Sequence, residues 1–255
     1  MATLRVTLVQ RAASLDAAEN RAALDVVPPL AEDSDLVVLP EASARDFGEP
    51  GGDLAPYAEP VDGPYATRLA VVAGHATVVA GMFETGPDRA RPYNTLVAAG
   101  PGGQRVYRKI HLYDSFGLRE SDQLSAGPIT PVVIDVVGWR VGLQTCYDLR
   151  FPELSRALVD QGAEVLVVPA AWVAGAGKVE HWRTLLRARA IENTAYVVAA
   201  AQPGPRYCGH SMVVAPDGDV LVETGQAGSV LTGELHRDRL AECRRTNPSL
   251  ANRRM

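Results

Sequence analysis

Three residues with complementary chemistry lie far apart in the sequence, each at the point where an apolar run stops. Glu41 follows DLVVLP, Lys109 ends QRVYRK, and Cys146 follows VGLQT. Because active sites in α/β proteins are commonly built at the ends of strands, we expect these three side chains to meet in one site.

The three side chains together suit nucleophilic catalysis. A free thiol has a pKa of about 8.5, so only a small fraction is thiolate at neutral pH. A carboxylate beside the thiol can act as general base, and an ammonium can stabilise the oxyanion of a tetrahedral intermediate. The start of a helix after Cys146 adds unpaired backbone N–H groups. Such a site could attack a carbonyl or nitrile carbon, form a thioester and release it to water.

Each residue also has a simpler interpretation when it is considered alone. Cys146 would then be a small apolar residue at a strand end, Glu41 a surface carboxylate and Lys109 an exposed charge. A Cys–His dyad with His111 is a further alternative, but no second acid or amide is in line with it. We therefore expect His111 to be a packing or hydrogen-bonding residue.

Composition excludes several classes of protein. The chain has 255 residues, 47% of them hydrophobic, and a net charge of −5, so it has a sizeable core and no basic surface for a nucleic acid. No apolar stretch approaches the roughly 20 residues of a membrane span, and the N-terminus lacks a signal-peptide pattern. Three widely spaced cysteines, among them Cys208 and Cys243 in unremarkable settings, argue against a disulfide framework. A cytoplasmic location is expected.

Lysine is rare in this chain. Of the 25 basic residues only Lys109 and Lys178 are lysines, and the rest are arginines. A lysine that persists in such a composition can mark a place where a compact ammonium is needed.

Apolar runs alternate with helical patterns along the chain, and the order of elements repeats. Each half runs strand, helix, strand, helix and then consecutive strands, which predicts two stacked sheets with helices outside and internal pseudo-symmetry. The connection 113–131 is long enough to suggest a functional loop. Strands are predicted over 4–10, 35–40, 76–85, 93–112 (a pair), 131–145 (a hairpin turning at Gly138–Trp139), 164–170, 195–202 and in a hairpin turning at 217–218; helices are predicted over 14–32 (capped by Ser14), 64–75, 152–162 and 178–193.

Three segments resemble the signature regions of the nitrilase superfamily, the carbon–nitrogen hydrolases. They are VVLPEAS around Glu41, YRKIHLYD around Lys109 and CYDLRFPEL from Cys146, and their order and separation match as well. PYNT, HWRTLLRARAIENTAYVVAAAQ and GHSMVVAPDG are also similar to the family. Within it, the sequence resembles the branch of ω-amidase and deaminated-glutathione amidase more than true nitrilases.

The resemblance implies a fold, a set of roles and an assembly. The fold is a four-layer α-β-β-α sandwich formed by a single domain over 1–255, its last ten or so residues a tail. Glu41 would be the general base, Lys109 the oxyanion-stabilising cation and Cys146 the nucleophile, with the Tyr147 N–H as second oxyanion donor. Glu120 would hold the lysine or the substrate amide; its alternative is a solvated loop carboxylate. No metal or organic cofactor is implied, and a homodimer is expected.

The pocket walls are less well specified. Tyr93, Asn94 and Trp172 are candidates for the substrate pocket, and Trp172 stands where relatives usually have phenylalanine, which leaves the substrate open. Four further charged residues are expected to be structural: Asp148 and Arg150 at the nucleophile turn, and Arg187 and Glu192 on the long helix.

These observations predict an amidase that hydrolyses a small linear amide through a Cys146 thioester. N-carbamoyl hydrolysis and nitrile hydrolysis are alternatives that the same three residues could support. A protein of this fold that binds a ligand without turnover is an alternative of another class. An intact carboxylate, ammonium and thiol argue against it, because a buried ion pair is costly to desolvate.

Overall fold

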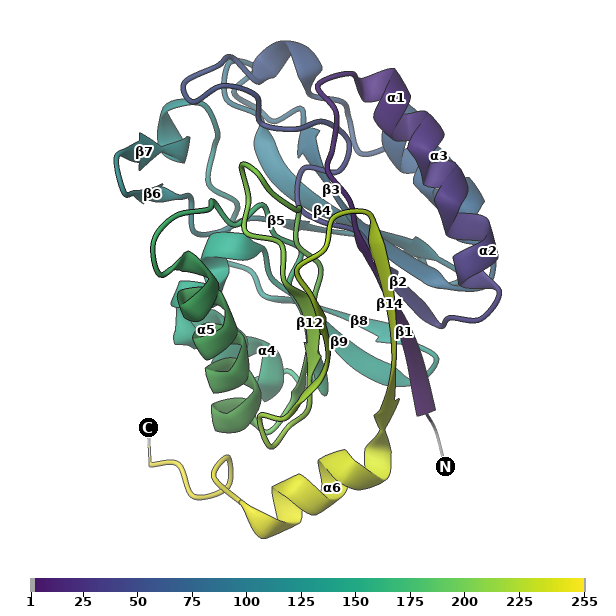
Figure 1. Cartoon of the computed structure of the whole chain (residues 1–255), viewed down its shortest axis with the longest axis vertical. Helices are drawn as coiled ribbons and strands as arrows, with labels where there is room; N and C mark the ends of the chain where they lie inside the picture. The colour runs from purple at the N-terminus through teal and green to yellow at the C-terminus, as the bar shows by residue number, and fades with distance from the viewer. Residues whose placement is uncertain (1–2, 255) are drawn as a thin grey trace.

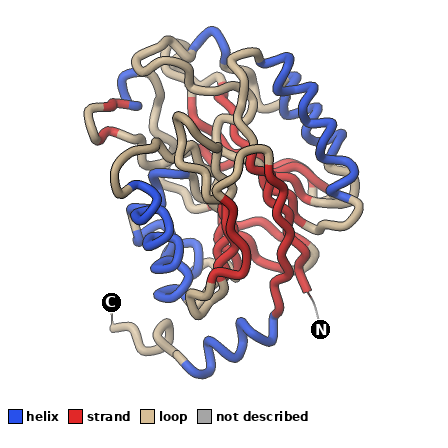
Figure 2. The backbone as a smooth tube through the Cα atoms, in the orientation of Figure 1, coloured by secondary structure: helices blue, strands red, loops and turns tan. Residues whose placement is uncertain are grey.

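Two six-stranded sheets pack face to face in the computed structural model, which describes residues 3–254 (Figures 1 and 2). Helices cover the outer face of each sheet, so the architecture is the predicted α-β-β-α sandwich. The first sheet has the order β14 (Ser229–His236), β1 (Thr3–Gln10), β2 (Leu36–Val38), β3 (Thr77–Glu84), β4 (Tyr93–Gly100), β5 (Gly103–Arg108). The second has the order β13 (Val220–Thr224), β12 (Ser211–Val214), β11 (Tyr196–Ala199), β10 (Val165–Val167), β9 (Trp139–Leu143), β8 (Val132–Val136).

The central strands β2, β3 and β4 of the first sheet are buried on both faces, which explains their continuous apolar sequences. In β2, Leu36 and Val38 pack into the core between the sheets, whereas Val37 packs under the helices. Burying each such side chain contributes about 1.5–3 kcal/mol. The first sheet is covered by α1 (Ala17–Ala22), η1 (Ala23–Val26), α2 (Val27–Ala31) and α3 (Pro64–Val72), and the second by α4 (Pro152–Asp160) and α5 (Lys178–Asn193); α6 (Arg237–Thr246) follows β14 (Figure 1).

The two sheets share one pattern of strand directions. From β14 to β5 and from β8 to β13, successive pairs are antiparallel, parallel, parallel, antiparallel and antiparallel. The predicted pseudo-symmetry is therefore confirmed. In the first sheet the place of β8 is taken by β14, a strand near the end of the chain that the sequence analysis did not predict.

The first helical region is not the single helix predicted over 14–32. It breaks into α1, the 3-10 segment η1 and α2, and its N-cap is Asp16, whose carboxylate accepts the N–H groups of Ala18 and Glu19. Pro28 and Pro29 explain the break, because each lacks an N–H and crowds the carbonyl four residues earlier. The Ser14 cap was therefore wrong by two residues.

Two other local predictions need adjustment. The β8–β9 hairpin turns at Val137–Gly138, both with positive φ, and Trp139 already begins β9 as a fully buried residue. The connection 113–131 contains a small hairpin of β6 (Asp114–Ser115) and β7 (Leu118–Arg119) and the short helix η3 (Glu120–Asp122). Among the described residues, no helix combines the length and apolar character needed to cross a membrane.

The directions of the strands bring Glu41 and Lys109 to the same end of the first sheet. β5 runs in the same direction as β2, since two antiparallel pairings separate it from β3. Glu41 and Lys109, which follow these strands, therefore lie at the same end of the sheet. Gly81 in β3 allows the chain after β2 to approach closely, because a Cβ there would lie 2.7 Å from the Cα of Glu41.

Substitution of Gly81 by alanine tests this close approach. The added methyl group has no space, so we expect Gly81→Ala to lower the free energy of unfolding by about 1–3 kcal/mol and to displace Glu41. Urea denaturation measures the change. Gly102→Ala is the matched control, because a Cβ at Gly102 meets nothing within 4 Å. Equal stability of the two variants would contradict the interpretation.

Candidate active site

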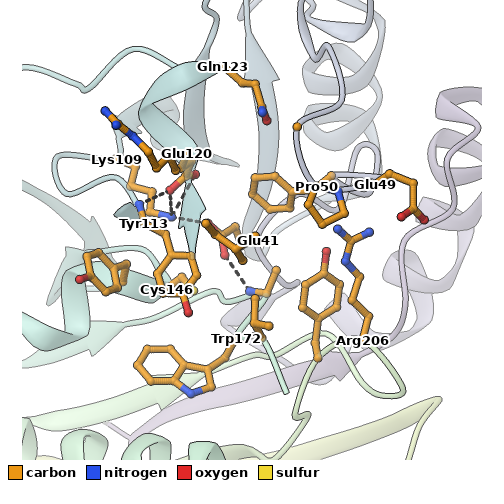
Figure 3. A pocket seen from close by; sticks show the side chains of 18 of the residues that line it. Glu41, Glu49, Pro50, Lys109, Tyr113, Glu120, Gln123, Cys146, Trp172 and Arg206 are labelled. Carbon is orange, nitrogen blue, oxygen red and sulfur yellow. Dashed lines mark hydrogen bonds and ion pairs between the residues drawn. The ribbon is translucent and has the colours of Figure 1, made fainter. Parts of the chain in front are cut away.

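The four side chains predicted to be catalytic line one cavity of about 110 Å³ at the end of the sheets (Figure 3). The exposed fractions are 1% for Glu41, 2% for Lys109 and 7% for Cys146, and the Glu120 side chain is 8% exposed. The structure therefore brings together residues that are separated by up to 105 positions in the sequence (146 − 41). The simpler interpretations of Glu41 and Lys109 as surface charges are wrong.

Lys109 is held between two carboxylates. Its Nζ donates to Glu41 Oε1 at 2.9 Å and to Glu120 Oε2 and Oε1 at 2.9 and 3.2 Å. Burial alone lowers the pKa of the ammonium, but the charges of Glu120 and Glu41 outweigh it and raise the pKa of Lys109 well above its usual value. The two carboxylates therefore favour the charged form of Lys109.

Backbone and amide groups fix the two carboxylates. Asn94 Nδ2 donates to Glu41 Oε1 at 2.7 Å and to Glu120 Oε1 at 3.0 Å, while the Ala171 N–H donates to Glu41 Oε2 at 2.7 Å. Gln202 Nε2 donates to the Glu41 carbonyl at 2.9 Å. Glu41 is thus fixed from both sheets, since Asn94 belongs to β4 and Ala171 lies shortly after β10.

Glu120 is a buried partner of Lys109 and not the solvated loop carboxylate considered as its alternative. Its Oε2 also accepts the N–H of Tyr113 at 2.6 Å. This bond joins the residues before and after the small β6–β7 hairpin, and Glu120 also contacts Lys109. The long connection 113–131 therefore contributes directly to the site.

Cys146 begins the 3-10 helix η4 (Cys146–Arg150) with a left-handed backbone, at φ +45°. Its N–H donates to the Pro169 carbonyl at 3.0 Å, and non-glycine residues in this conformation persist only where their surroundings hold them. Burial raises the pKa of the Cys146 thiol well above its ordinary value, Glu41 raises it further, and Lys109 opposes the rise. Burial and the Glu41 carboxylate therefore both favour the neutral form of the thiol.

Asp148 anchors the turn that carries Cys146, as predicted. Its buried carboxylate accepts bonds from Tyr107 Oη at 2.6 Å, the Thr145 N–H at 2.9 Å and the His111 N–H at 3.1 Å. His111 Nδ1 lies 2.8 Å from the same carboxylate and its ring stacks on Phe151. His111 is therefore the predicted hydrogen-bonding and packing residue.

Arg189 is a second anchor that the sequence analysis missed. Its guanidinium is buried and donates twice to the Leu149 carbonyl, at 3.0 and 2.8 Å, and once to Glu192 at 2.9 Å. Arg187 donates to the Gly218 carbonyl, so Arg187 and Glu192 are structural as predicted. Arg150 instead lies with its guanidinium over the Trp172 ring, at 4.9 Å.

The predicted pocket residues divide into three groups. Tyr147 and Trp172 line the cavity. Asn94 lies behind the two carboxylates and supports them. Tyr93 is not among the described residues that line the cavity; its ring packs beside Gly86 and under the Arg108 guanidinium, so its assignment to the pocket was wrong.

Several residues of the cavity wall were not predicted from the sequence. The long loop 113–131 was the only signal for those on the β6–β7 hairpin, and the rarity of lysine was the only signal for Lys178. The unassigned wall residues are Phe47, Glu49, Pro50, Gly51, Tyr113, Leu118, Arg119, Gln123, Ala171, Val173, Lys178, Arg206 and Tyr207.

Within residues 3–254, no group of three or more His, Cys, Asp or Glu side chains is arranged to hold a metal ion.

Comparison with known proteins identifies the same family over almost the whole chain. Residues 5–245 match the model of the family described as carbon-nitrogen hydrolase. A hydrolase of Mycobacterium tuberculosis is 41% identical, over 94% of this chain and 92% of its own. A deaminated glutathione amidase of Escherichia coli O157:H7 is 40% identical, over 87% of this chain and 86% of its own. An omega-amidase of Bos taurus is 32% identical, over 100% of this chain and 96% of its own.

A solved structure shares the architecture closely. It is a CN-hydrolase superfamily protein from Xanthomonas campestris with an arsenic adduct in its active site, superposed with a TM-score of 0.90 at 31% identity. The match covers 100% of this chain and 98% of that one. The resemblance found in the sequence motifs is therefore confirmed by the whole chain and by its fold.

Removal of the Asp148 carboxylate should destabilise the nucleophile turn. Asp148→Ala leaves the Tyr107 hydroxyl and two backbone N–H groups without an acceptor, so we expect the free energy of unfolding to fall by at least about 3 kcal/mol. Urea denaturation measures it, with Asp122→Ala as control because that carboxylate is exposed. A loss no larger than the control's would show that Asp148 does not hold the turn.

The titration of Cys146 should depend on Glu41. The raised pKa means that thiolate forms only as the pH rises well past the ordinary thiol value. Glu41→Gln removes a negative charge beside the sulfur, so we expect thiolate to form at lower pH than in the wild type. Ultraviolet absorbance of the thiolate, taken as a difference from Cys146→Ala, follows the titration. An unchanged or higher pKa in Glu41→Gln would contradict the coupling.

Proposed function

The chain belongs to the carbon–nitrogen hydrolase family, and within that family we propose that it is an amidase that hydrolyses a small linear amide to a carboxylate and ammonia. The observation that carries the proposal is that a thiol, Cys146, a carboxylate, Glu41, and an ammonium, Lys109, line one cavity and are all buried. Membership of the family shows that the protein is a hydrolase of C–N bonds, and the relatives of this chain that are named amidases support the proposed reaction.

In the acylation step, Glu41 takes the proton from the Cys146 sulfur as the sulfur attacks the amide carbonyl carbon. The oxyanion that forms is stabilised by the Lys109 ammonium and by the N–H of Tyr147, which lies in the first turn of η4, where N–H groups lack intrahelical partners. Glu41 then gives its proton to the amide nitrogen. The C–N bond breaks, ammonia leaves, and a thioester remains on Cys146.

In the deacylation step, a water molecule takes the place of ammonia. Glu41 accepts a proton from this water as its oxygen attacks the thioester carbon. When the second tetrahedral intermediate collapses, the C–S bond breaks and the proton returns to sulfur. The acid product is released, and the site regains its thiol and its carboxylate.

Glu120 and Asn94 are positioning residues in this proposal. Their contacts hold Lys109 and Glu41 while charge moves between sulfur, oxygen and nitrogen. A site that is fixed before the substrate arrives spends no energy on reorganisation during the reaction, which is the usual source of a large electrostatic contribution.

The acyl group is proposed from the relatives and the pocket. The omega-amidase and the deaminated glutathione amidase suggest a linear amide, and Trp172, which lines the cavity, would contact its acyl group. On the family resemblance we also propose a homodimer and a cytoplasmic location.

Ammonia release from a panel of amides tests the proposal. The panel contains ω-amides of 2-oxo acids, deaminated glutathione, N-carbamoyl amines and simple nitriles. We expect turnover of a linear amide that falls at least about 1000-fold in Cys146→Ala, because the nucleophile is lost. Release of carbon dioxide with ammonia would instead identify a carbamoyl substrate.

Two further outcomes would overturn the proposal. Turnover that survives in Cys146→Ala would remove the thioester mechanism. No turnover on any substrate, together with a Cys146 that does not react with iodoacetamide, would show that this cysteine is not a nucleophile.

A further inference from the structure

Lys178 lines the same cavity as Cys146 and is the second of the chain's two lysines. It opens α5, is 8% exposed, and its Nζ donates to the Tyr113 hydroxyl at 3.0 Å. Nζ also lies 3.4 Å from the centre of the Phe116 ring. Among residues 3–254 it has no carboxylate within 4 Å, so the structure leaves this buried ammonium without a counterion.

A second cation lies beside it and is equally uncompensated. The Arg150 guanidinium lies 4.9 Å from the Trp172 ring centre and 5.6 Å from that of Phe116, and Nη2 is 3.3 Å from His181 Nδ1. Its Nε is buried without a partner, and it forms no ion pair within the described part of the chain. Burial and the Arg150 charge both lower the pKa of Lys178.

The other basic groups of the cavity differ, because each has an acidic partner. Arg206 pairs with Asp46 at 3.1 Å, and Arg119 lies 3.5 Å from Asp122. The cavity is therefore polarised. Around Lys109 two carboxylates face one ammonium, whereas at Lys178 and Arg150 no carboxylate of residues 3–254 lies within 4 Å of the positive charge.

A polarised cavity of this kind suits a substrate with two different ends. The amide must lie at Cys146, between the carboxylate base and the Lys109 ammonium. Resting on the proposed amidase function, we propose that Lys178 binds a carboxylate at the other end of the acyl chain and so selects anionic linear amides over neutral ones. The Tyr113 hydroxyl, which also lines the cavity, accepts a hydrogen bond from Nζ and so orients the ammonium.

A purely structural role of Lys178 makes a different prediction. The contact with Phe116 would then fasten the β6–β7 hairpin, and through it Glu120, over the site. Loss of that contact would slow the hydrolysis of every amide to the same extent. The ratio between a charged and a neutral substrate therefore separates the two roles.

Succinamate and levulinamide provide the ratio, because levulinamide has a methyl ketone where succinamate has a carboxylate. We expect wild-type kcat/KM to be about 10- to 100-fold higher for succinamate, the effect of one charge-assisted hydrogen bond. Lys178→Met should abolish this preference mainly through a higher KM for succinamate. Lys178→Arg should retain part of it, and Arg254→Met, which removes an exposed charge in the tail, should retain all of it.

Two results would overturn the assignment. One is a wild-type enzyme that hydrolyses both amides equally well, and the other is a Lys178→Met variant that loses activity on both to the same extent.

A binding readout keeps this test separate from the amidase proposal. Succinate should slow the alkylation of Cys146 by iodoacetamide in the wild type and not in Lys178→Met. Protection without turnover of any amide would refute the amidase proposal and support the carboxylate site. Turnover without protection or charge preference would refute the carboxylate site alone.

Discussion

The buried ammonium of Lys109 is the charge around which the site is arranged. An isolated ammonium out of water is strongly unfavourable, and it becomes tolerable only when carboxylates and further hydrogen bonds surround it. Glu41 and Glu120 supply the charges, and Asn94 supplies a bond to each of them. Burial first, and then the Glu41 carboxylate, raise the pKa of the Cys146 thiol, while Lys109 opposes the rise.

The sandwich meets this constraint by drawing on both of its sheets. In the first sheet, Glu41 and Lys109 follow strands that end on the same side. In the second sheet, Cys146 and the Ala171 N–H follow the ends of β9 and β10. Each of these groups closely follows a strand of a sheet, and β2 and β10, which precede Glu41 and Ala171, are fully buried. Asp148 and Arg189 then fix the turn after the sulfur.

The parts of the molecule that were predictable are those with a local signal. Strand ends show where an apolar run stops, and these ends located Glu41, Lys109 and Cys146. The break in the first helix was also visible, in Pro28 and Pro29, but the helical periodicity around them outweighed it. Asn94 was predicted as a pocket residue, but its contact with the Glu41 carboxylate could not be read from the sequence, and Arg189 was not predicted at all. Both contacts join residues forty or more positions apart. The assignment of Tyr93 to the pocket was wrong because Tyr93 precedes Asn94 in a strand, and successive side chains of a strand point to opposite faces of the sheet.

The strand β14 has a consequence for how the molecule is made. During synthesis the chain emerges from its N-terminus, so β1 must wait for nearly the whole protein before its antiparallel partner exists. Until then one edge of the first sheet offers unpaired backbone groups, which is the kind of edge that pairs with other chains. The second sheet, whose six strands are consecutive in the sequence, has no such wait. The first half of the protein therefore completes its sheet only after the second half has been made.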